Sequence, residues 1–272
     1  MHRVRKRVRG RHALITGGSA GIGFALAQRL LRCGAGVTLV ARNAARLDAA
    51  KQQLEHAIAG ARVRTLSVDV SDAESVAAQL TPELQAQPID YLFNNAGVSR
   101  PGYFWAIPPA EFKRQNEINF DGVVHVTRAA LPTLKTSTDA HIVNVGSLSS
   151  VIASLGHSAY CSSKFALYGF SDVLRAELKP LGIRVSIALP PEVETGMLAA
   201  ELPHLPPGAK ELQQSAGLLS ADAVALAILR GMNSSNFEII PGALARASVL
   251  AYRWLPNVSR AYCDWVVRRA NR

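Results

Sequence analysis

The sequence has few cysteines, few aromatic residues and no hydrophobic run long enough to cross a membrane. Its three cysteines, Cys33, Cys161 and Cys263, have neither the spacing of a disulfide framework nor that of a zinc site. A membrane-spanning helix needs about 20 consecutive apolar residues, and no stretch approaches that length. No secretory signal is recognisable at the amino terminus. We therefore expect no disulfide, no metal and a cytoplasmic location, with attachment to a membrane surface as the alternative.

Acidic residues are also scarce, with 20 against 30 basic residues and a net charge of +10. The excess lies at the ends, because six of residues 1–12 are arginine or lysine and residues 243–272 hold six arginines and one aspartate. No nucleic-acid recognition motif accompanies these ends, so we expect no nucleic-acid partner. We expect a basic tail over residues 1–12, either solvated or attracted to anionic lipid, one catalytic domain over residues 13–242, and a basic aromatic extension over residues 243–272.

Short apolar runs alternate with helical patterns through the middle of the chain. We expect strands at residues 12–16, 36–40, 63–68, 89–93, 141–145, 184–189 and 237–240. We expect helices after the first strand and at residues 44–58, 109–131, 159–178 and 221–232. This alternation predicts a single-domain α/β fold of Rossmann type, with helices on both faces of a parallel sheet. Such folds bind ligands at the carboxyl ends of their strands.

A glycine-rich turn, residues 16–23, follows the first expected strand and opens a helix. Its glycines are spaced for a tight turn, for close approach of the backbone to a pyrophosphate and for close packing of helix on strand. The amino terminus of the helix would then face the phosphates. Because a strand and a helix flank the turn, the pattern favours a dinucleotide site over a plain loop, with contacts from Gly17, Ser19, Gly21, Ile22 and Gly23.

The end of the second expected strand distinguishes between the two nicotinamide cofactors. Folds that bind NAD place an acidic residue there for the ribose hydroxyls, whereas this chain has Ala41, Arg42 and Asn43. An arginine without a carboxylate beside it suits the 2′-phosphate of NADP(H), and a plain surface arginine is the alternative. After the third strand, Asp69 and Val70 are candidates for contact with the adenine, although Asp69 could instead cap the next helix.

Tyr160 and Lys164 lie four residues apart and therefore share one face of the expected helix. Ser147 follows the strand at residues 141–145 and is expected at the ligand-binding edge of the sheet. The free pKa of tyrosine is about 10, and a nearby lysine cation should lower it. A serine hydroxyl could hold a carbonyl oxygen while the tyrosine supplies a proton. The pattern indicates carbonyl reduction or alcohol oxidation, although such a pair alone is common on protein surfaces.

Several motifs now stand in a fixed order: the turn at residues 16–23, Asn94-Asn95-Ala96-Gly97 after the fourth strand, Asn119, Ser147 and the Tyr160/Lys164 pair. In this order they resemble the classical short-chain dehydrogenase/reductase family over about residues 12–242. The resemblance implies a doubly wound, seven-stranded parallel sheet and a homo-dimer or homo-tetramer assembled through the helices after strands four and five. It implies a catalytic tetrad of Asn119, Ser147, Tyr160 and Lys164. It also implies that NADP(H) contacts Gly17, Ser19, Gly21, Ile22, Gly23, Arg42, Asp69, Val70, Asn95, Ala96, Gly97, Tyr160, Lys164, Pro190, Val193 and Thr195.

The same resemblance gives each catalytic residue a role. Tyr160 would donate a proton to the carbonyl oxygen, and Ser147 would hold that oxygen by a hydrogen bond. Lys164 would lower the pKa of Tyr160 and bind the nicotinamide ribose. Asn119 would use its side chain and a local kink of its helix to seat a water molecule in the proton relay. Thr195 would contact the carboxamide of the nicotinamide.

One departure from the family pattern narrows the resemblance. The family commonly has Pro-Gly after strand six, where this chain has Pro190-Pro191. That segment, with the Arg42 end of strand two, resembles the 3-ketodihydrosphingosine (3-dehydrosphinganine) reductase branch, which reduces a long-chain keto-sphingoid base with NADPH. We therefore expect NADPH-dependent reduction of a ketone on a small, hydrophobic, lipid-like substrate. The alternatives are a reductase for another hydrophobic carbonyl (steroid, retinoid or keto-acyl compound) and an NADPH-binding regulator without turnover.

Two segments near the carboxyl end lie outside the regular alternation of strands and helices. Residues 196–219 are rich in leucine, proline and glycine, which predicts a mobile flap over an apolar pocket. Beyond residue 242, arginines recur among tyrosines and tryptophans, and Pro256 should divide the segment into two helices. Such a segment could lie on a bilayer as a peripheral contact, or dock on its own domain or on a partner subunit.

Overall fold

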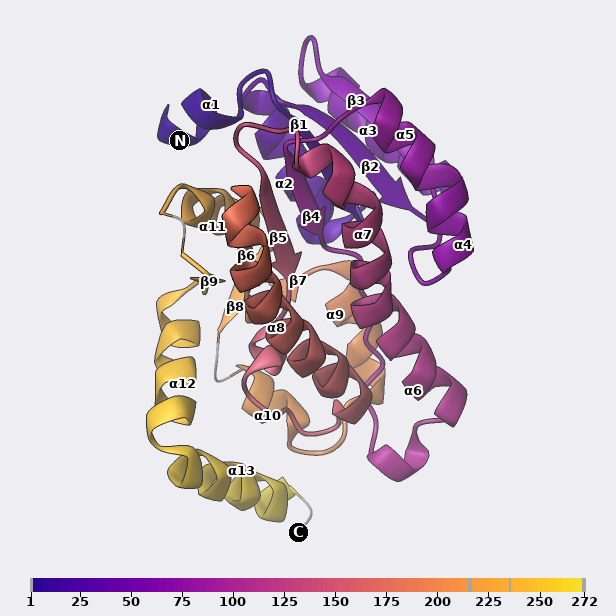
Figure 1. Cartoon of the computed structure of the whole chain (residues 1–272). Coiled ribbons are helices and arrows are strands. Elements are labelled where there is room, and N and C mark those ends of the chain that lie inside the picture. The colour runs from indigo at the N-terminus through magenta and orange to yellow at the C-terminus, as the bar shows by residue number, and fades with distance from the viewer. Residues whose placement is uncertain (1, 215–216, 235, 271–272) are drawn as a thin grey trace.

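The structure, a computed structural model, describes residues 2–214, 217–234 and 236–270. Its central sheet has seven parallel strands in the order β3-β2-β1-β4-β5-β6-β9, so the predicted doubly wound sheet is confirmed (Figure 1). The strands are β1 (His12–Thr16), β2 (Gly36–Ala41), β3 (Arg62–Ser67), β4 (Tyr91–Asn94), β5 (His141–Val145), β6 (Arg184–Ala188) and β9 (Glu238–Ile239). The strand order reverses between β1 and β4, which is where such sheets form a ligand crevice.

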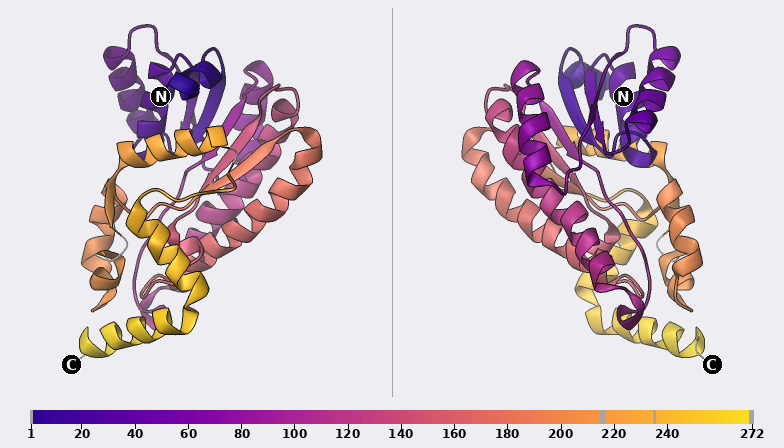
Figure 2. Two further views of the ribbon diagram at one scale, coloured as in Figure 1. Left: turned by 90° about the vertical axis from the view of Figure 1, so that its left-hand side faces the viewer. Right: turned by 90° about the vertical axis from the view of Figure 1, so that its right-hand side faces the viewer.

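Helices cover both faces of this sheet, as predicted (Figure 2). One face carries α2 (Gly21–Arg32), α3 (Ala44–Ala57) and α11 (Ala221–Ser234), and the other carries α5 (Thr81–Ala86), α7 (Gly122–Leu134) and α8 (Ser158–Leu178). The remaining elements are α1 (His2–Val8), α4 (Ala73–Ser75), α6 (Pro109–Asn116), α9 (Gly196–Glu201), α10 (Ala209–Gln214), α12 (Ala243–Trp254), α13 (Pro256–Ala270), β7 (Glu192–Glu194), β8 (Leu218–Ser220), η1 (Val76–Leu80), η2 (Phe104–Ala106), η3 (Glu117–Asp121), η4 (Leu148–Ser150), η5 (Lys179–Leu181) and η6 (Leu202–His204).

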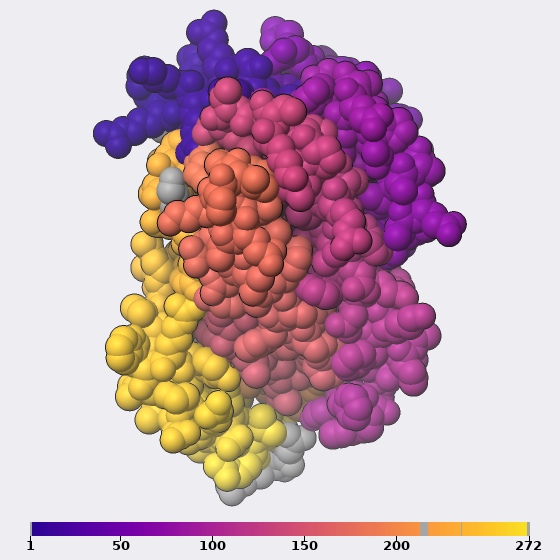
Figure 3. Space-filling view, in the orientation of Figure 1, coloured from indigo at the N-terminus to yellow at the C-terminus, as the bar shows by residue number. Residues whose placement is uncertain are grey.

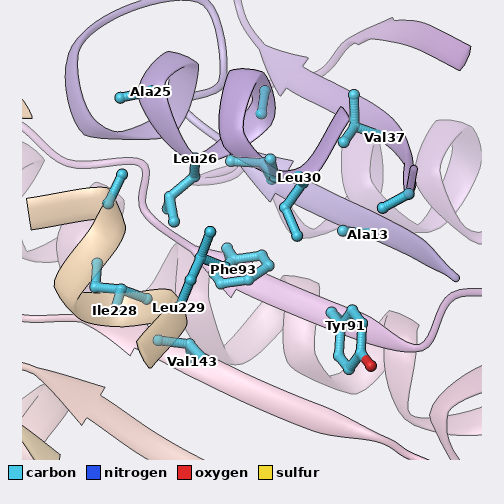
Figure 4. Packing of buried hydrophobic residues seen from close by; sticks show 14 of the residues in the cluster. Ala13, Ala25, Leu26, Leu30, Val37, Tyr91, Phe93, Val143, Ile228 and Leu229 are labelled. Carbon is cyan, nitrogen blue, oxygen red and sulfur yellow. The ribbon is translucent and has the colours of Figure 1, made fainter. Parts of the chain in front are cut away.

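The layer between α2, α11 and the sheet is closely packed (Figure 4). Leu26 and Leu30 of α2 and Leu229 of α11 lie around Phe93 of β4, and each is at most 1% exposed. Burying each such side chain contributes roughly 1.5–3 kcal/mol relative to leaving it in water. This layer fixes the strand ends that carry the turn at residues 16–23 and the segment after β4.

The amino-terminal residues do not form the predicted solvated tail. Residues 2–8 form α1, in which Val4 and Val8 are each 2% exposed and pack into the core beside α2 and α11. Arg7 binds both carboxylate oxygens of Asp139 at 2.9 Å. The prediction failed because the basic residues obscured two valines four positions apart, which face the same side of a helix.

The segment at residues 196–219 is also more regular than the predicted flap. It contains α9, the turn η6 and α10, and it ends in β8, which pairs with β7 in a separate two-stranded parallel sheet. These elements have three to six residues each, and elements that short show no hydrophobic period in a sequence.

The carboxyl-terminal extension forms two helices, α12 and α13, that divide at Pro256 as predicted. They run along one side of the molecule and across one end of it (Figure 3). Ala245, Val249 and Val266 of these helices are buried against the domain, and Arg253 binds Glu238. The extension therefore docks on its own domain. Among the described residues, no helix is long and apolar enough to span a bilayer.

Candidate active site

A cavity of about 800 Å³ opens at the carboxyl ends of the strands. The turn at residues 16–23 lines one end of it through Gly17 and Gly21, and Ser147, Tyr160 and Lys164 line the same cavity. A continuous space therefore joins the phenol of residue 160 to the predicted dinucleotide turn, which the catalytic hypothesis requires.

Ser147 and Tyr160 are positioned by the two elements that follow β5. The Ser147 backbone N–H donates to Ser150 Oγ at 3.2 Å, and its Oγ accepts from the Ser149 N–H at 3.1 Å, which closes a capping box on η4. Tyr160 lies in the first turn of α8. Ser147 and Tyr160 both line the cavity, and hydrogen bonding by Ser147 acts to lower the pKa of the phenol. The two oxygens therefore converge on one point of the cavity, where a substrate carbonyl oxygen can sit.

Burial controls the charges of the tyrosine–lysine pair. Burial raises the pKa of Tyr160, the charge of Glu201 raises it further, and the hydrogen bond from Ser147 opposes the rise. Burial also lowers the pKa of Lys164 to about 8. The Nζ atom of Lys164 lies 5.6 Å from the centre of the Tyr160 ring and donates to the carbonyl oxygen of Val145 at 3.0 Å. The net shift at Tyr160 is therefore opposite to the lowering that the sequence predicted from the lysine.

Asn119 lies in the π-helical turn η3, which provides the expected kink in the long helix. Its side chain is fully buried and already bonded: Oδ1 accepts from the Val98 N–H at 2.8 Å, and Nδ2 donates to the Val98 carbonyl at 2.9 Å and to Ser163 Oγ at 3.1 Å. These bonds show that the amide holds the chain after β4, and the use of this side chain to seat a water stays a prediction. Asn119 does not line the cavity.

The turn at residues 16–23 needs glycine for steric reasons. A Cβ at Gly23 would lie 2.4 Å from the carbonyl oxygen of Gly17, and Gly17 itself has a φ of +64°. Asn95 Nδ2 donates to the carbonyls of Thr16 at 3.0 Å and Gly17 at 3.2 Å. Gly21 adopts a φ of +54°, and a Cβ there would lie 3.2 Å from Thr195 Cγ2. Asn95 thus fixes the turn to the end of β4.

A second cavity, of about 610 Å³, continues from the first along the ends of β2 and β3. It shares Gly17 and Gly97 with the first cavity and is also lined by Ser19, Arg42, Asp69, Val70 and Ala96. The Nη1 atom of Arg42 lies 3.7 Å from Oδ2 of Asp69. Asp72, and not Asp69, caps the next helix by accepting from the N–H groups of Glu74 and Ser75.

The structure adds Arg46 to the residues at this end. It lines both cavities, and its backbone N–H donates to Asn43 Oδ1 at 2.9 Å in the cap of α3. A signal for it is visible in the sequence, since a second arginine follows Arg42 by four residues, in the first turn of α3.

The remaining predicted cofactor residues also lie in this groove. Ile22, Pro190, Val193 and Thr195 line the first cavity, and Thr195 Oγ1 donates to the Val193 carbonyl at 3.2 Å. Gly23 lines neither cavity and acts in the packing of the turn. The groove fits a dinucleotide, because its glycines leave the backbone open beside a helix amino terminus and two arginines lie at its far end.

The wall opposite the dinucleotide groove was predicted from the sequence only for residues 196–219, and the contribution of α12 and α13 was not predicted. It includes side chains of α12 and α13 that are mainly apolar: Ser248, Ala251, Tyr252, Leu255, Val258, Ser259, Tyr262 and Cys263. Two of the leucines from residues 196–219, Leu198 and Leu212, line the cavity as well, whereas Leu202 and Leu218 are about half exposed. Glu192, Glu201 and His157 give this wall its charged part.

Known proteins with similar sequences are dehydrogenases and reductases. The family model described as short chain dehydrogenase matches residues 11–205. A 3-dehydrosphinganine reductase from Danio rerio is 35% identical over 237 residues, covering 85% of this chain and 71% of that protein. A 3-ketodihydrosphingosine reductase from Bos taurus is 35% identical over 233 residues, covering 84% of this chain and 70% of that protein.

Solved structures of similar fold hold nicotinamide cofactors. A short-chain dehydrogenase/reductase from Burkholderia phymatum in complex with NAD superposes with a TM-score of 0.80 at 26% identity, covering 93% of this chain and 96% of that one. A short-chain dehydrogenase from Sphingobium yanoikuyae in complex with NADPH has a TM-score of 0.76 at 28% identity, covering 92% and 95%. The chain therefore belongs to the short-chain dehydrogenase family and is an oxidoreductase that uses a nicotinamide cofactor.

Proposed function

We propose that the protein reduces the ketone of a long-chain keto-sphingoid base, 3-ketodihydrosphingosine, to the secondary alcohol with NADPH. The observation that carries the proposal is the shape of the first cavity. Ser147 and Tyr160 lie in the same space as an apolar wall from α9, α10, α12 and α13. A lipid chain can follow that wall while its carbonyl meets the two oxygens. The names of the relatives support this choice of substrate.

Each catalytic side chain has one task in this proposal. NADPH, when bound, supplies a hydride to the carbonyl carbon. Ser147 donates a hydrogen bond to the carbonyl oxygen, and Tyr160 gives its proton to the same oxygen, so that hydride and proton together convert ketone to alcohol. Lys164 binds the nicotinamide ribose through Nζ. Asn119 positions the segment after β4 through its bonds to Val98.

The preference for NADPH over NADH rests on the second cavity. Arg42 and Arg46 both line it, and the 2′-phosphate of NADPH is the one group that separates the two cofactors. The sequence predicted no carboxylate beside Arg42, but Asp69 Oδ2 lies 3.7 Å from its Nη1. The Arg42 side chain is 53% exposed, so its other nitrogens are accessible to a phosphate oxygen. Two arginines at this position favour the cofactor with the additional phosphate.

The outer surface of the extension supports contact with a membrane. Leu250, Trp254 and Trp265 are 55%, 79% and 49% exposed, and arginines recur between them. Aromatic and basic side chains together suit the interface of an anionic bilayer, from which a lipid substrate would reach the cavity. We propose that the enzyme acts as a peripheral protein at this surface.

A homo-dimer or homo-tetramer is proposed through α8. Phe165 and Val173 of this helix are 43% and 58% exposed, and Gly169 lies midway between them with open space above it. Residues four apart share one helix face, so these three form an apolar stripe suited to a second copy of the chain.

Substrate panels test the proposed reaction. Oxidation of NADPH is followed with 3-ketodihydrosphingosine, a steroid ketone, retinal and a short β-keto ester, each in the same detergent. We expect the highest kcat/KM with 3-ketodihydrosphingosine. A higher value with the steroid or retinal would overturn the choice of substrate, and binding of NADPH without oxidation of it across the panel would identify a regulator.

A further inference from the structure

An acidic side chain lies beside the catalytic phenol on the substrate wall. Glu201, at the end of α9, is 8% exposed and lines the cavity together with Ser147 and Tyr160. Its Oε2 atom lies 3.7 Å from His157 Nε2. Glu192 of β7 lines the same part of the cavity. Figure 1 shows α9 beyond the carboxyl end of β5.

The carboxylate acts on its neighbours through its charge. Glu201 raises the pKa of Tyr160, where burial is the larger cause. It also raises the pKa of Glu192, again after burial, while His157 and Lys210 oppose that rise. Burying carboxylates is costly unless a cation or several hydrogen bonds compensate for the lost water. NADPH offers no such cation, because its dihydronicotinamide ring is neutral and its phosphates are negatively charged.

The position of the substrate carbonyl is set independently by Ser147 and Tyr160. If the carbonyl oxygen lies between their hydroxyls, the two carbons attached to the carbonyl lie within a few ångströms of it. A charged group on either carbon would then lie in the region where Glu201 influences the phenol. A carboxylate in that region would attract a cationic group and would gain nothing from a neutral one.

We propose that Glu201, assisted by Glu192, binds an ammonium group on the carbon next to the ketone, so that the cavity selects α-amino ketones over neutral ketones. This inference rests on the proposed function and identifies the feature that separates a keto-sphingoid base from a steroid or retinoid. The bound ammonium also offsets the negative charge beside Tyr160, which favours transfer of the phenol proton to the substrate oxygen.

His157 positions the carboxylate in this arrangement. It is 3% exposed, its Nδ1 lies 3.0 Å from the carbonyl oxygen of Leu155, and its ring centre lies 6.1 Å from that of Tyr160. A purely structural Glu201–His157 pair would instead support α8 and α9 whatever the substrate. The two roles are separated by comparing substrates and not by activity alone.

The test uses 3-ketodihydrosphingosine and 1-hydroxyoctadecan-3-one, which is the same ketone without the amine. The quantity measured is the ratio of kcat/KM for the amine to that for the neutral ketone. We expect Glu201→Gln to lower this ratio by roughly tenfold or more, the cost of a lost charge-assisted hydrogen bond, mainly through KM. Glu194→Gln is the matched control, since it neutralises an exposed carboxylate of β7 that does not line the cavity, and it should leave the ratio unchanged.

Three outcomes would overturn the inference. If Glu201→Gln keeps both kcat/KM values and hence their ratio, ammonium binding is refuted while the reductase function stands. If both kcat/KM values fall equally, Glu201 has a structural role only. Failure of the unmodified enzyme to reduce 3-ketodihydrosphingosine removes the proposed function and this inference together.

A second measurement does not depend on the folding of any variant. Octadecylamine and octadecanol are titrated into the unmodified enzyme loaded with NADPH in a calorimeter. We expect the amine to bind at least tenfold more tightly, and equal affinities would contradict the inference.

Discussion

The two sides of the cavity are built differently. On the cofactor side, the turn at residues 16–23 and the chain after β4 are fixed to one another by backbone and amide hydrogen bonds, and two arginines and Asp69 are the charged groups nearby. On the substrate side, short elements and two terminal helices form an apolar wall with an acidic part. The difference shows that the dinucleotide end of the cavity is held together by backbone and amide groups, whereas side chains from the last third of the chain form the opposite wall.

The largest expected effect on activity is at Tyr160, where the two sides of the cavity meet. Tyr160→Phe should lower kcat/KM by roughly a thousandfold, since general acid catalysis contributes about 10²–10⁴. Binding of NADPH, measured by its fluorescence, should stay within twofold. The control is Tyr168→Phe on the same helix, because its hydroxyl binds Glu238 away from the cavity. Turnover in Tyr160→Phe within tenfold of the unmodified enzyme would remove the phenol from the chemistry.

The basic end of the cofactor side is tested by Arg42→Asp. We expect KM for NADPH to rise by roughly 30-fold and KM for NADH to fall or stay level, because a charge-assisted bond to the 2′-phosphate is replaced by repulsion. Arg32→Asp makes the same change of charge on α2 outside both cavities. If both variants keep the preference for NADPH, Arg42 does not bind the phosphate.

The apolar wall is tested by two leucines of nearly equal exposure. Leu255, 56% exposed, lines the cavity, whereas Leu250, 55% exposed, does not. Leu255→Asn should lower kcat/KM for the long-chain ketone by about fivefold, equivalent to roughly 1 kcal/mol of lost apolar contact, with little change for a short β-keto ester. Leu250→Asn should leave both values level in detergent. Equal effects of the two variants would show that α12 does not contact the lipid chain.

The last prediction concerns the free energy of unfolding in acid. His12 of β1 is buried, which lowers its pKa to about 4 from 6.5, and its Nε2 lies 2.8 Å from Thr38 Oγ1. Between those two values the unfolded chain binds more protons, so the free energy of unfolding should fall as pH drops from 6.5 to 4, by at most about 1.4 kcal/mol per pH unit. Urea unfolding of His12→Gln should show a shallower decrease, and an identical slope would contradict the assignment.

The cofactor side could be predicted from the sequence because backbone requirements leave local signals. A left-handed φ at Gly17 and Gly21 and a blocked Cβ at Gly23 restrict those positions to glycine. The strand and helix around them have regular periods, so the alternation of strands and helices could be predicted, and Tyr160 and Lys164 could be placed on one helix face. Those signals lie within a few residues of one another.

The substrate side left no such signals. Glu201 and Leu255 are separated from Ser147 in the sequence and share one cavity through the fold alone. The raised pKa of Tyr160 also escaped prediction, since burial depends on every surrounding element. Val4 and Val8 of α1 were missed because arginines dominate the composition there.

Transfer of an isotope tests the proposed reaction most directly. The unmodified enzyme is incubated with 3-ketodihydrosphingosine and NADPH that carries deuterium at both C4 positions, and the lipid product is analysed by mass spectrometry. We expect dihydrosphingosine with one deuterium bound to C3, which shows that the ring at the turn of residues 16–23 and the carbonyl at Tyr160 meet in the cavity. Product without deuterium, or no product while NADPH binds, would contradict that meeting.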